Sequence, residues 1–280
     1  MLLKAPMNLC GYYIYKNIKE AKRTPVYKAI KNGEKFVLKF SSNEMIKHEY
    51  AIMAQMSHKN VLKANEIIIK DGIYGYAMPY AKGKTLYIYL NEYVKQGRII
   101  PEIKVQSIMK QIFSGLFYIH SLGLVHRDIK LENIYFMDEN YSDIVLADFE
   151  FTKHLNNNDS IDFLGTNPYK APEYLNEDRT YSNKIDCWSA GIIMYFLLFN
   201  TYPFYKPNYQ VDEEEYWDEE KIINCSFQFG NIQRSKYAKH LIKKLLCADP
   251  QKRYSAEKAL NHPWFSEITG NSNVRFEKSN

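Results

Sequence analysis

The chain has 280 residues, of which 46% are hydrophobic, so it can form one large domain or two lobes around an ample core. Its net charge of +5 comes from 37 basic and 32 acidic residues that are interleaved along the chain, which argues against a nucleic-acid-binding patch. The four cysteines lie far apart, and the longest apolar run, residues 190–199, is too short to span a bilayer. These features predict a soluble, intracellular protein with reduced thiols and no membrane anchor. The expected location is the cytoplasm, with the nucleus as the alternative.

Short apolar runs separated by polar turns fill residues 9–40 and predict β-hairpins. The last run, residues 34–40, follows the turn signal Asn32-Gly33 and carries Lys39 among apolar neighbours. An ammonium in apolar surroundings is costly unless an acid pairs with it. Lys39 is therefore either an edge-strand lysine that faces water or a functional residue, and the pattern alone leaves both interpretations open.

Two helices and a further strand are predicted next. Apolar residues at helical spacing predict a helix over residues 43–56, which contains Glu49, and residues 73–78 have the composition of a strand. Residues 102–121 repeat apolar side chains every three to four positions, and Gly123 follows as a helix-stop signal.

The segment at residues 126–133, His-Arg-Asp-Ile-Lys-Leu-Glu-Asn, contains a carboxylate, an ammonium and an amide within eight positions. An apolar run at residues 144–147 then predicts a short strand that delivers Asp148, 15 residues after Asn133. Two acidic groups and an amide are thereby expected at the ends of short strands. Taken alone, the segment could also be an ordinary charged surface loop.

The combination resembles the catalytic loop and the metal-binding turn of eukaryotic protein kinases. In that family, the residues at the positions of Asp128 and Lys130 act on the substrate hydroxyl and on the transferring phosphoryl group. The residues at the positions of Asn133 and Asp148 hold Mg²⁺. The resemblance therefore implies two catalytic residues, two metal ligands, and ATP and Mg²⁺ as cofactors.

The resemblance covers about residues 12–265 and implies an α+β, bilobal fold. Residues 1–79 would form a small N-terminal lobe with an antiparallel sheet and one main helix. Residues 80–266 would form a larger, mainly helical C-terminal lobe, and residues 267–280 a polar tail. Together the two lobes would make one protein kinase domain.

An ATP site in the N-terminal lobe is also implied. Lys39 would grip the α- and β-phosphates and pair with Glu49, although the ten-residue gap between them is short for the family. Met78 would be the gatekeeper, and adenine would meet the carbonyl of Pro79 and the N–H of Ala81. The complete implied set of ATP-binding residues is Ile18, Val26, Val37, Lys39, Glu49, Met78, Pro79, Ala81 and Tyr135.

Two departures from the family pattern concern the phosphates. Lys19, Ala21 and Thr24 stand where the phosphate-covering loop normally has glycines, so that loop should hold phosphates less closely, unless neighbouring basic side chains compensate. Glu150 replaces the glycine that normally ends the metal-binding turn, which adds a negative charge near the phosphates. These departures keep open an alternative, a pseudokinase that binds nucleotide or acts as a scaffold.

Later segments extend the resemblance. Residues 165–173 resemble the segment that seats the substrate. A second alternative, a small-molecule kinase, would lack Ala171-Pro172-Glu173 and the pair of Asp186 and Trp188. Asp186 would cap a buried central helix and brace the catalytic loop. Arg253 would form a buried ion pair with Glu173.

Substrate preference is predicted from three residues. Lys130 and Thr166 match the serine/threonine class, in which the threonine contacts both Asp128 and the lysine. Glu132, together with an acidic run at residues 212–220, suggests protein substrates with basic residues near the phosphosite, although the run could simply be a solvated helical face. The motif at residues 262–265 looks most like that of the calmodulin-dependent-kinase-like branch of the family. The protein is expected to be a monomer.

Activation is predicted from the arginine before the catalytic aspartate. In many kinases with this arginine, here Arg127, a phosphorylated residue in the activation segment neutralises it. Asp162 stands at the usual position of that residue and could supply a permanent negative charge. Ser160 is the alternative, as an ordinary regulatory phosphosite.

Overall fold

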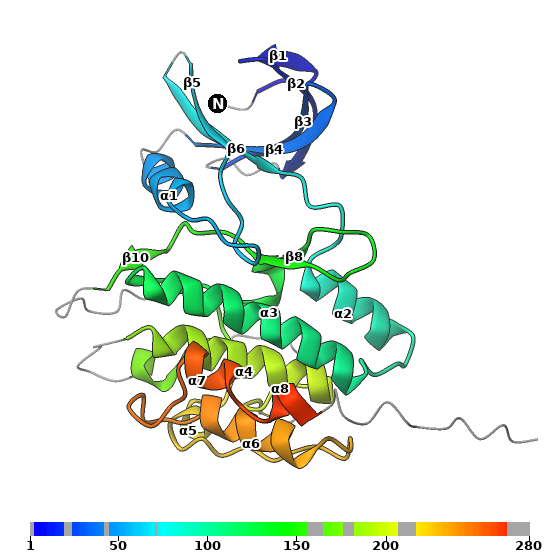
Figure 1. The fold of residues 1–280 in the computed structure, drawn as a ribbon, viewed down its shortest axis with the longest axis vertical. Coiled ribbons are helices and arrows are strands. Elements are labelled where there is room, and N and C mark those ends of the chain that lie inside the picture. Colours follow the sequence, from blue (N-terminus) through cyan, green and yellow to red (C-terminus); the bar gives the residue numbers. More distant parts are fainter. Residues whose placement is uncertain are drawn as a thin grey trace, which may run out of the picture.

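The computed structural model describes residues 3–19, 24–41, 45–70, 72–155, 165–175, 182–206 and 217–267. An antiparallel sheet with one helix forms the N-terminal part, and a larger, mainly helical part follows it (Figure 1). This is the predicted fold class. The exact lobe boundaries at residues 79 and 266 stay predictions.

The N-terminal sheet has six strands in the order β1-β2-β3-β4-β6-β5, and every neighbouring pair is antiparallel. At the predicted turn, Asn32 and Gly33 both have positive φ, at 52° and 80°, as the tight two-residue turn of a β-hairpin requires. The strands are β1 (Met7–Leu9), β2 (Tyr12–Lys19), β3 (Val26–Lys31), β4 (Glu34–Ser41), β5 (Glu66–Lys70) and β6 (Ile73–Pro79).

Alternation along β4 divides its side chains between two faces. Leu38 and Phe40 are buried in the hydrophobic core of the sheet. Lys39 points to the opposite face, where its direct neighbours in the register are Val26 on β3 and Tyr76 on β6. Because β4 lies between two other strands and Lys39 is 8% exposed, the interpretation of Lys39 as a water-facing edge lysine is wrong.

Helix α1 (Met45–Ala54) packs beside the sheet (Figure 1) and is shorter than the predicted helix. It buries Ile46, Glu49, Ile52 and Met53, which recur at the three-to-four spacing of one helical face. Glu49 is thus the acidic residue that α1 turns toward the sheet.

The helical part is built around α4 (Lys184–Phe199), which is buried on nearly all sides, as its apolar sequence predicts. Helix α3 (Glu102–Ser121) has the predicted bounds and packs on α4 (Figure 1). On the other side of α4, a Cβ added to Gly191 would lie 2.8 Å from Leu245, so glycine permits the close approach of α6. The remaining helices are α2 (Leu86–Lys95), α5 (Glu219–Ile223), α6 (Lys236–Leu245), α7 (Ala256–Leu260) and α8 (Trp264–Glu267), with a 3₁₀ turn η2 (Pro172–Leu175).

Two short strand pairs lie where the N-terminal sheet meets the helical part (Figure 1). Strand β7 pairs with β10, and β8 pairs with β9. Their bounds, with those of the 3₁₀ turn η1, are β7 (Leu124–Val125), η1 (Leu131–Asn133), β8 (Ile134–Phe136), β9 (Ile144–Leu146) and β10 (Lys153–His154). None of the helices in the described ranges is long and apolar enough to cross a membrane.

Candidate active site

The register of β8 and β9 brings Asn133 next to Asp148. Ile134 pairs with Leu146, and one step further the N–H of Ala147 donates to the carbonyl oxygen of Asn133 over 2.9 Å. Asp148 follows directly and has a φ of +65°, a conformation that is uncommon for a residue with a Cβ. The two predicted metal ligands are therefore neighbours, as their spacing in the sequence predicts.

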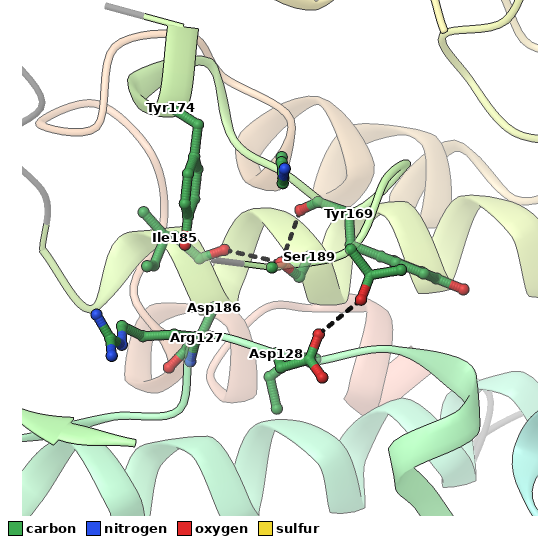
Figure 2. Close-up of a pocket in the computed structure, with 11 residues that line it drawn as sticks. Arg127, Asp128, Tyr169, Tyr174, Ile185, Asp186 and Ser189 are labelled. Atoms are coloured by element: carbon green, nitrogen blue, oxygen red, sulfur yellow. Dashed lines mark hydrogen bonds between the residues drawn. The ribbon is translucent and has the colours of Figure 1, made fainter. Parts of the chain in front are cut away.

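Asp128 is buried and held from three sides. Asn133 Nδ2 donates to its Oδ2 over 2.9 Å, and Lys130 Nζ lies 2.7 Å from the same oxygen. The Thr166 hydroxyl donates to Oδ1 over 2.9 Å and accepts a hydrogen bond of 2.9 Å from Lys130 Nζ. The dashed line at Asp128 in Figure 2 is the bond from Thr166. Thr166 thus contacts both residues, as predicted.

A glycine in an unusual backbone conformation precedes Thr166. Gly165 has a φ of +106°, which an L side chain rarely adopts, so a substitution there would strain the backbone. A small pocket lies beneath the contact between Thr166 and Asp128, with Asp128, Tyr169 and Ser189 among its lining residues (Figure 2). The Gly-Thr pair is therefore fixed by backbone geometry.

Asp186 braces the loop that carries Asp128. Its Oδ1 accepts from the N–H of Arg127, and its Oδ2 accepts from the N–H of His126 and from His120 Nε2, each over 2.9 Å. Burial alone would raise the pKa of Asp186, but these donors and the nearby imidazoles hold it below its usual range. The carboxylate therefore stays ionised in the core.

The predicted capping role of Asp186 is wrong. Helix α4 starts at Lys184 with Asn183 as its N-cap, so Asp186 lies inside the first turn. From that position its side chain reaches the catalytic loop rather than the free N–H groups of its own helix.

Lys39 and Glu49 form the predicted pair, with 2.9 Å between Nζ and Oε1. Lys39 Nζ also lies 3.1 Å from Asp148 Oδ1. Burial alone would lower the pKa of Lys39, but the two carboxylates raise it above its usual range. In turn, burial would raise the pKa of Asp148, but Lys39, together with His126 and Lys130, holds it below its usual range. The lysine and Asp148 therefore both carry charge at neutral pH.

The donor set at Asn133 and Asp148 fits Mg²⁺, which binds oxygen ligands. Asp148 supplies a carboxylate. Asn133 directs its Nδ2 at Asp128, so its Oδ1 faces away and can coordinate a cation. Within the described ranges, no cluster of three or more His, Cys, Asp or Glu side chains forms a cage for a metal. One carboxylate with one amide oxygen suits Mg²⁺, which proteins usually hold with one or two carboxylates and the phosphates of a substrate.

Comparison with known proteins agrees with this geometry. The protein kinase domain family matches residues 13–265. The chain belongs to the protein kinase family. A probable myosin light chain kinase of Dictyostelium discoideum is 34% identical over 240 residues, which are 82% of this kinase and 72% of that relative. Calcium-dependent protein kinase 6 of Plasmodium berghei is 30% identical over 258 residues, 91% of this kinase but only 16% of that relative's length.

Several of the predicted ATP-binding residues of the kinase belong to two neighbouring cross-strand residue pairs of the sheet. Val37 faces Met78, and Val26 faces Lys39 one row along, so all four share a face of the sheet. Tyr135 lies on β8, and burial together with the nearby Asp148 carboxylate raises the pKa of its hydroxyl group. Pro79 ends β6 and Ala81 follows it, both half-buried, whereas Ile18 on β2 is 47% exposed.

Residues 20–23 at the tip of the phosphate-covering loop lie outside the described residues. What the missing glycines do to phosphate binding therefore stays a prediction.

Glu132 lies beside the substrate segment of the kinase. Its charge and the neighbouring Tyr202 contribute, after burial, to the raised pKa of Tyr169. No described residue donates a hydrogen bond to Glu132 Oε2, although that atom is buried. Of the acidic run, residues 212–216 lie outside the described residues, while Glu219 and Glu220 are exposed at the start of α5.

Arg127 points away from Asp128 (Figure 2). Its Nε donates to the carbonyl oxygen of Phe151 over 2.5 Å, which ties the catalytic loop to the start of the activation segment. Ser160 and Asp162 lie outside the described residues, so the proposed pairing of Arg127 with Asp162 stays a prediction.

Three contacts of the site could not be predicted from the sequence. Tyr76 hydrogen-bonds to Glu49, His120 to Asp186, and His48 on α1 to the carbonyl oxygen of Thr152 over 3.3 Å. Each joins segments far apart in sequence, so only the strand and helix packing could have revealed them.

Proposed function

We propose that this chain is an active protein serine/threonine kinase that transfers the γ-phosphoryl group of ATP to hydroxyl groups of protein substrates. The observation that carries the proposal is the closed network of Asp128, Lys130 and Thr166. It presents a carboxylate and an ammonium at one point, which is what in-line transfer to a hydroxyl needs.

In the proposed reaction, the substrate hydroxyl attacks the γ-phosphorus of ATP while the bond to the β-phosphate oxygen breaks and ADP leaves. Asp128 accepts the proton of the hydroxyl. Lys130 stabilises the negative charge of the transferring group, and Lys39, held by Glu49, aligns the α- and β-phosphates. Bound Mg²⁺, held by Asp148 and Asn133, would supply charge neutralisation at the phosphates.

Serine/threonine specificity is supported by the contact between Lys130 and Thr166. The motif at residues 262–265 and the two relatives support a place in the calmodulin-dependent-kinase-like branch. The four cysteines are free thiols, which supports an intracellular location, and we expect the kinase to act as a monomer.

The test uses three peptides that differ only in carrying serine, threonine or tyrosine as the acceptor, with radiolabelled ATP and Mg²⁺. We expect label in the serine and threonine peptides and none in the tyrosine peptide. The alternative, a pseudokinase, draws its support from Glu150 and the glycine-free loop. Binding of ATP without label in any peptide would favour it.

We also propose that the Glu132 carboxylate binds a basic side chain of the protein substrate. Its buried Oε2 lacks a described partner, and a carboxylate oxygen in that state gains most from an incoming cation. A peptide series with Arg, Gln or Glu near the acceptor should rank Arg first for the wild type. Glu132→Gln should reduce that preference, whereas a wild-type preference for Glu would contradict it.

A further inference from the structure

Glu150 places a third carboxylate beside the Lys39 ammonium. Its Oε2 lies 3.9 Å from Lys39 Nζ, next to the carboxylates of Glu49 and Asp148. The Glu150 charge is also one of the groups that, after burial, raise the pKa of Tyr76. Glu150 therefore belongs to the charged cluster around Lys39, although its side chain is 38% exposed.

The backbone at Glu150 forms a turn without strain. The N–H of Thr152 donates to the carbonyl oxygen of Phe149 over 3.0 Å, which closes a β-turn with Glu150 at its second position. Phe149 is fully buried and anchors that turn. The φ of Glu150 lies outside the left-handed region, so a glutamate is tolerated where the family pattern has glycine.

Among the residues that the structure describes, the charges around Lys39 do not balance. One ammonium faces three carboxylates, Glu49, Asp148 and Glu150, where the proposed function places the phosphates of ATP. Of the three, Glu150 is neither the partner on α1 nor a proposed metal ligand. Its charge is therefore available to attract Lys39 away from the phosphates and to repel them.

We propose that Glu150 sets the metal requirement of nucleotide binding. Its carboxylate competes with the phosphates for Lys39 and repels them until a divalent cation neutralises their charge. The inference rests on the proposed function for the position of the nucleotide, and it adds a residue that tunes phosphate affinity.

The test is isothermal titration calorimetry of ATP, ADP and adenosine, each in EDTA and in saturating Mg²⁺. The variants are Glu150→Gln, which removes the charge and keeps the size, and Glu150→Gly. The matched control is Glu92→Gln, which removes a carboxylate of similar exposure, 44% against 38% for Glu150, that pairs with Lys84 on the surface. A thermal melt of each variant checks folding.

In EDTA, both Glu150 variants should bind ATP about fivefold more tightly than the wild type, the size expected of one partly exposed charge pair. The gain should be smaller for ADP and absent for adenosine, since adenosine carries no phosphate. Saturating Mg²⁺ should remove most of the difference in ATP affinity between the wild type and the Glu150 variants. Glu92→Gln should bind all three ligands as the wild type does.

Equal ATP affinity of the wild type and Glu150→Gln in EDTA would overturn the inference. An equal gain for adenosine would also overturn it, because Glu150 would then act on the shape of the site. If the wild type and every variant failed to bind nucleotide under all conditions, the proposed function itself would fail, and the inference with it.

Discussion

The Thr166 hydroxyl donates to Asp128 across 38 residues of sequence while accepting from Lys130. It keeps the carboxylate and the ammonium in fixed positions. Thr166→Val removes both hydrogen bonds at nearly constant volume, and bonds to charged groups contribute about 1.5–3 kcal/mol. We expect kcat to fall roughly tenfold to hundredfold. Thr166→Ser is the control and should retain most activity in steady-state assays, whereas equal loss in both variants would assign the effect to packing.

Arg253 and Glu173 form a buried, bidentate ion pair, with 2.7 and 2.8 Å between their nitrogen and oxygen atoms. Arg253→Ala would leave the Glu173 carboxylate unpaired in the core. We expect it to lower the free energy of unfolding by about 3–5 kcal/mol in urea titrations. The double variant Arg253→Met with Glu173→Leu should recover part of that loss, because it removes both charges. A double variant as unstable as the single one would contradict this explanation.

His262 is predicted to make stability depend on pH. The N–H of Trp264 donates to its Nδ1, so its proton lies on Nε2, which faces His240 Nδ1 at 2.8 Å. Burial, with the neighbouring His240, lowers the pKa of His262 below its usual value of 6.5. Well above that pH the His262 ring is neutral in both the folded and the unfolded state, and below it the unfolded state takes up the second ring proton more readily than the folded state. The free energy of unfolding should therefore fall as pH drops below 6.5.

The measurement is a urea titration at steps between about pH 7.5 and 5.5, the range in which histidines titrate. His262→Asn keeps an acceptor for Trp264 and should show a shallower loss than the wild type. Part of the loss should remain, because burial also lowers the pKa of His58 and His126. An unchanged slope in His262→Asn would show that this histidine does not contribute.

The activation hypothesis is tested by phosphatase treatment. Because Asp162 is already anionic, we expect the stripped kinase to stay active, and Asp162→Ala or Arg127→Ala to reduce activity several-fold. Ser160→Ala should have little effect. Loss of activity on stripping, with recovery on modification of Ser160, would instead show ordinary control by phosphorylation.

Much of the site was predictable because its residues lie in short sequence motifs, and the spacing of residues within each motif determines how they are arranged in space. The motif at residues 126–133 and the strand before Asp148 predict the junction of Asn133 and Asp148, which the β8–β9 register then produces. The bounds of α3 followed from its apolar repeat and Gly123. Helix α4 was harder, because Asn183 gives no side-chain capping bond and the apolar run begins only after Asp186.

Contacts between distant segments were not predictable. Glu150 was recognised as an unusual charge, but its approach to Lys39 depends on how the turn after β9 meets β4. The burial of Lys39 depends on the pairing of β6 with β4. The sequence alone could not show whether β4 is a central strand or an edge strand. The sequence thus predicts the types of functional residues within each motif. It does not predict which distant segments contact one another, because those contacts depend on the three-dimensional fold.

The most direct test of the account compares phosphoryl transfer with nucleotide binding in Asp128→Asn. This change keeps the size of the side chain but removes the proton acceptor, and it does not alter the residues of the Lys39–Asp148 ion pair. With radiolabelled ATP and a serine peptide, we expect the variant to bind Mg²⁺-ATP as the wild type does and to lose about two or more orders of magnitude in turnover. Wild-type turnover in Asp128→Asn, or no transfer by the wild type itself, would contradict the claim that this site performs the chemistry.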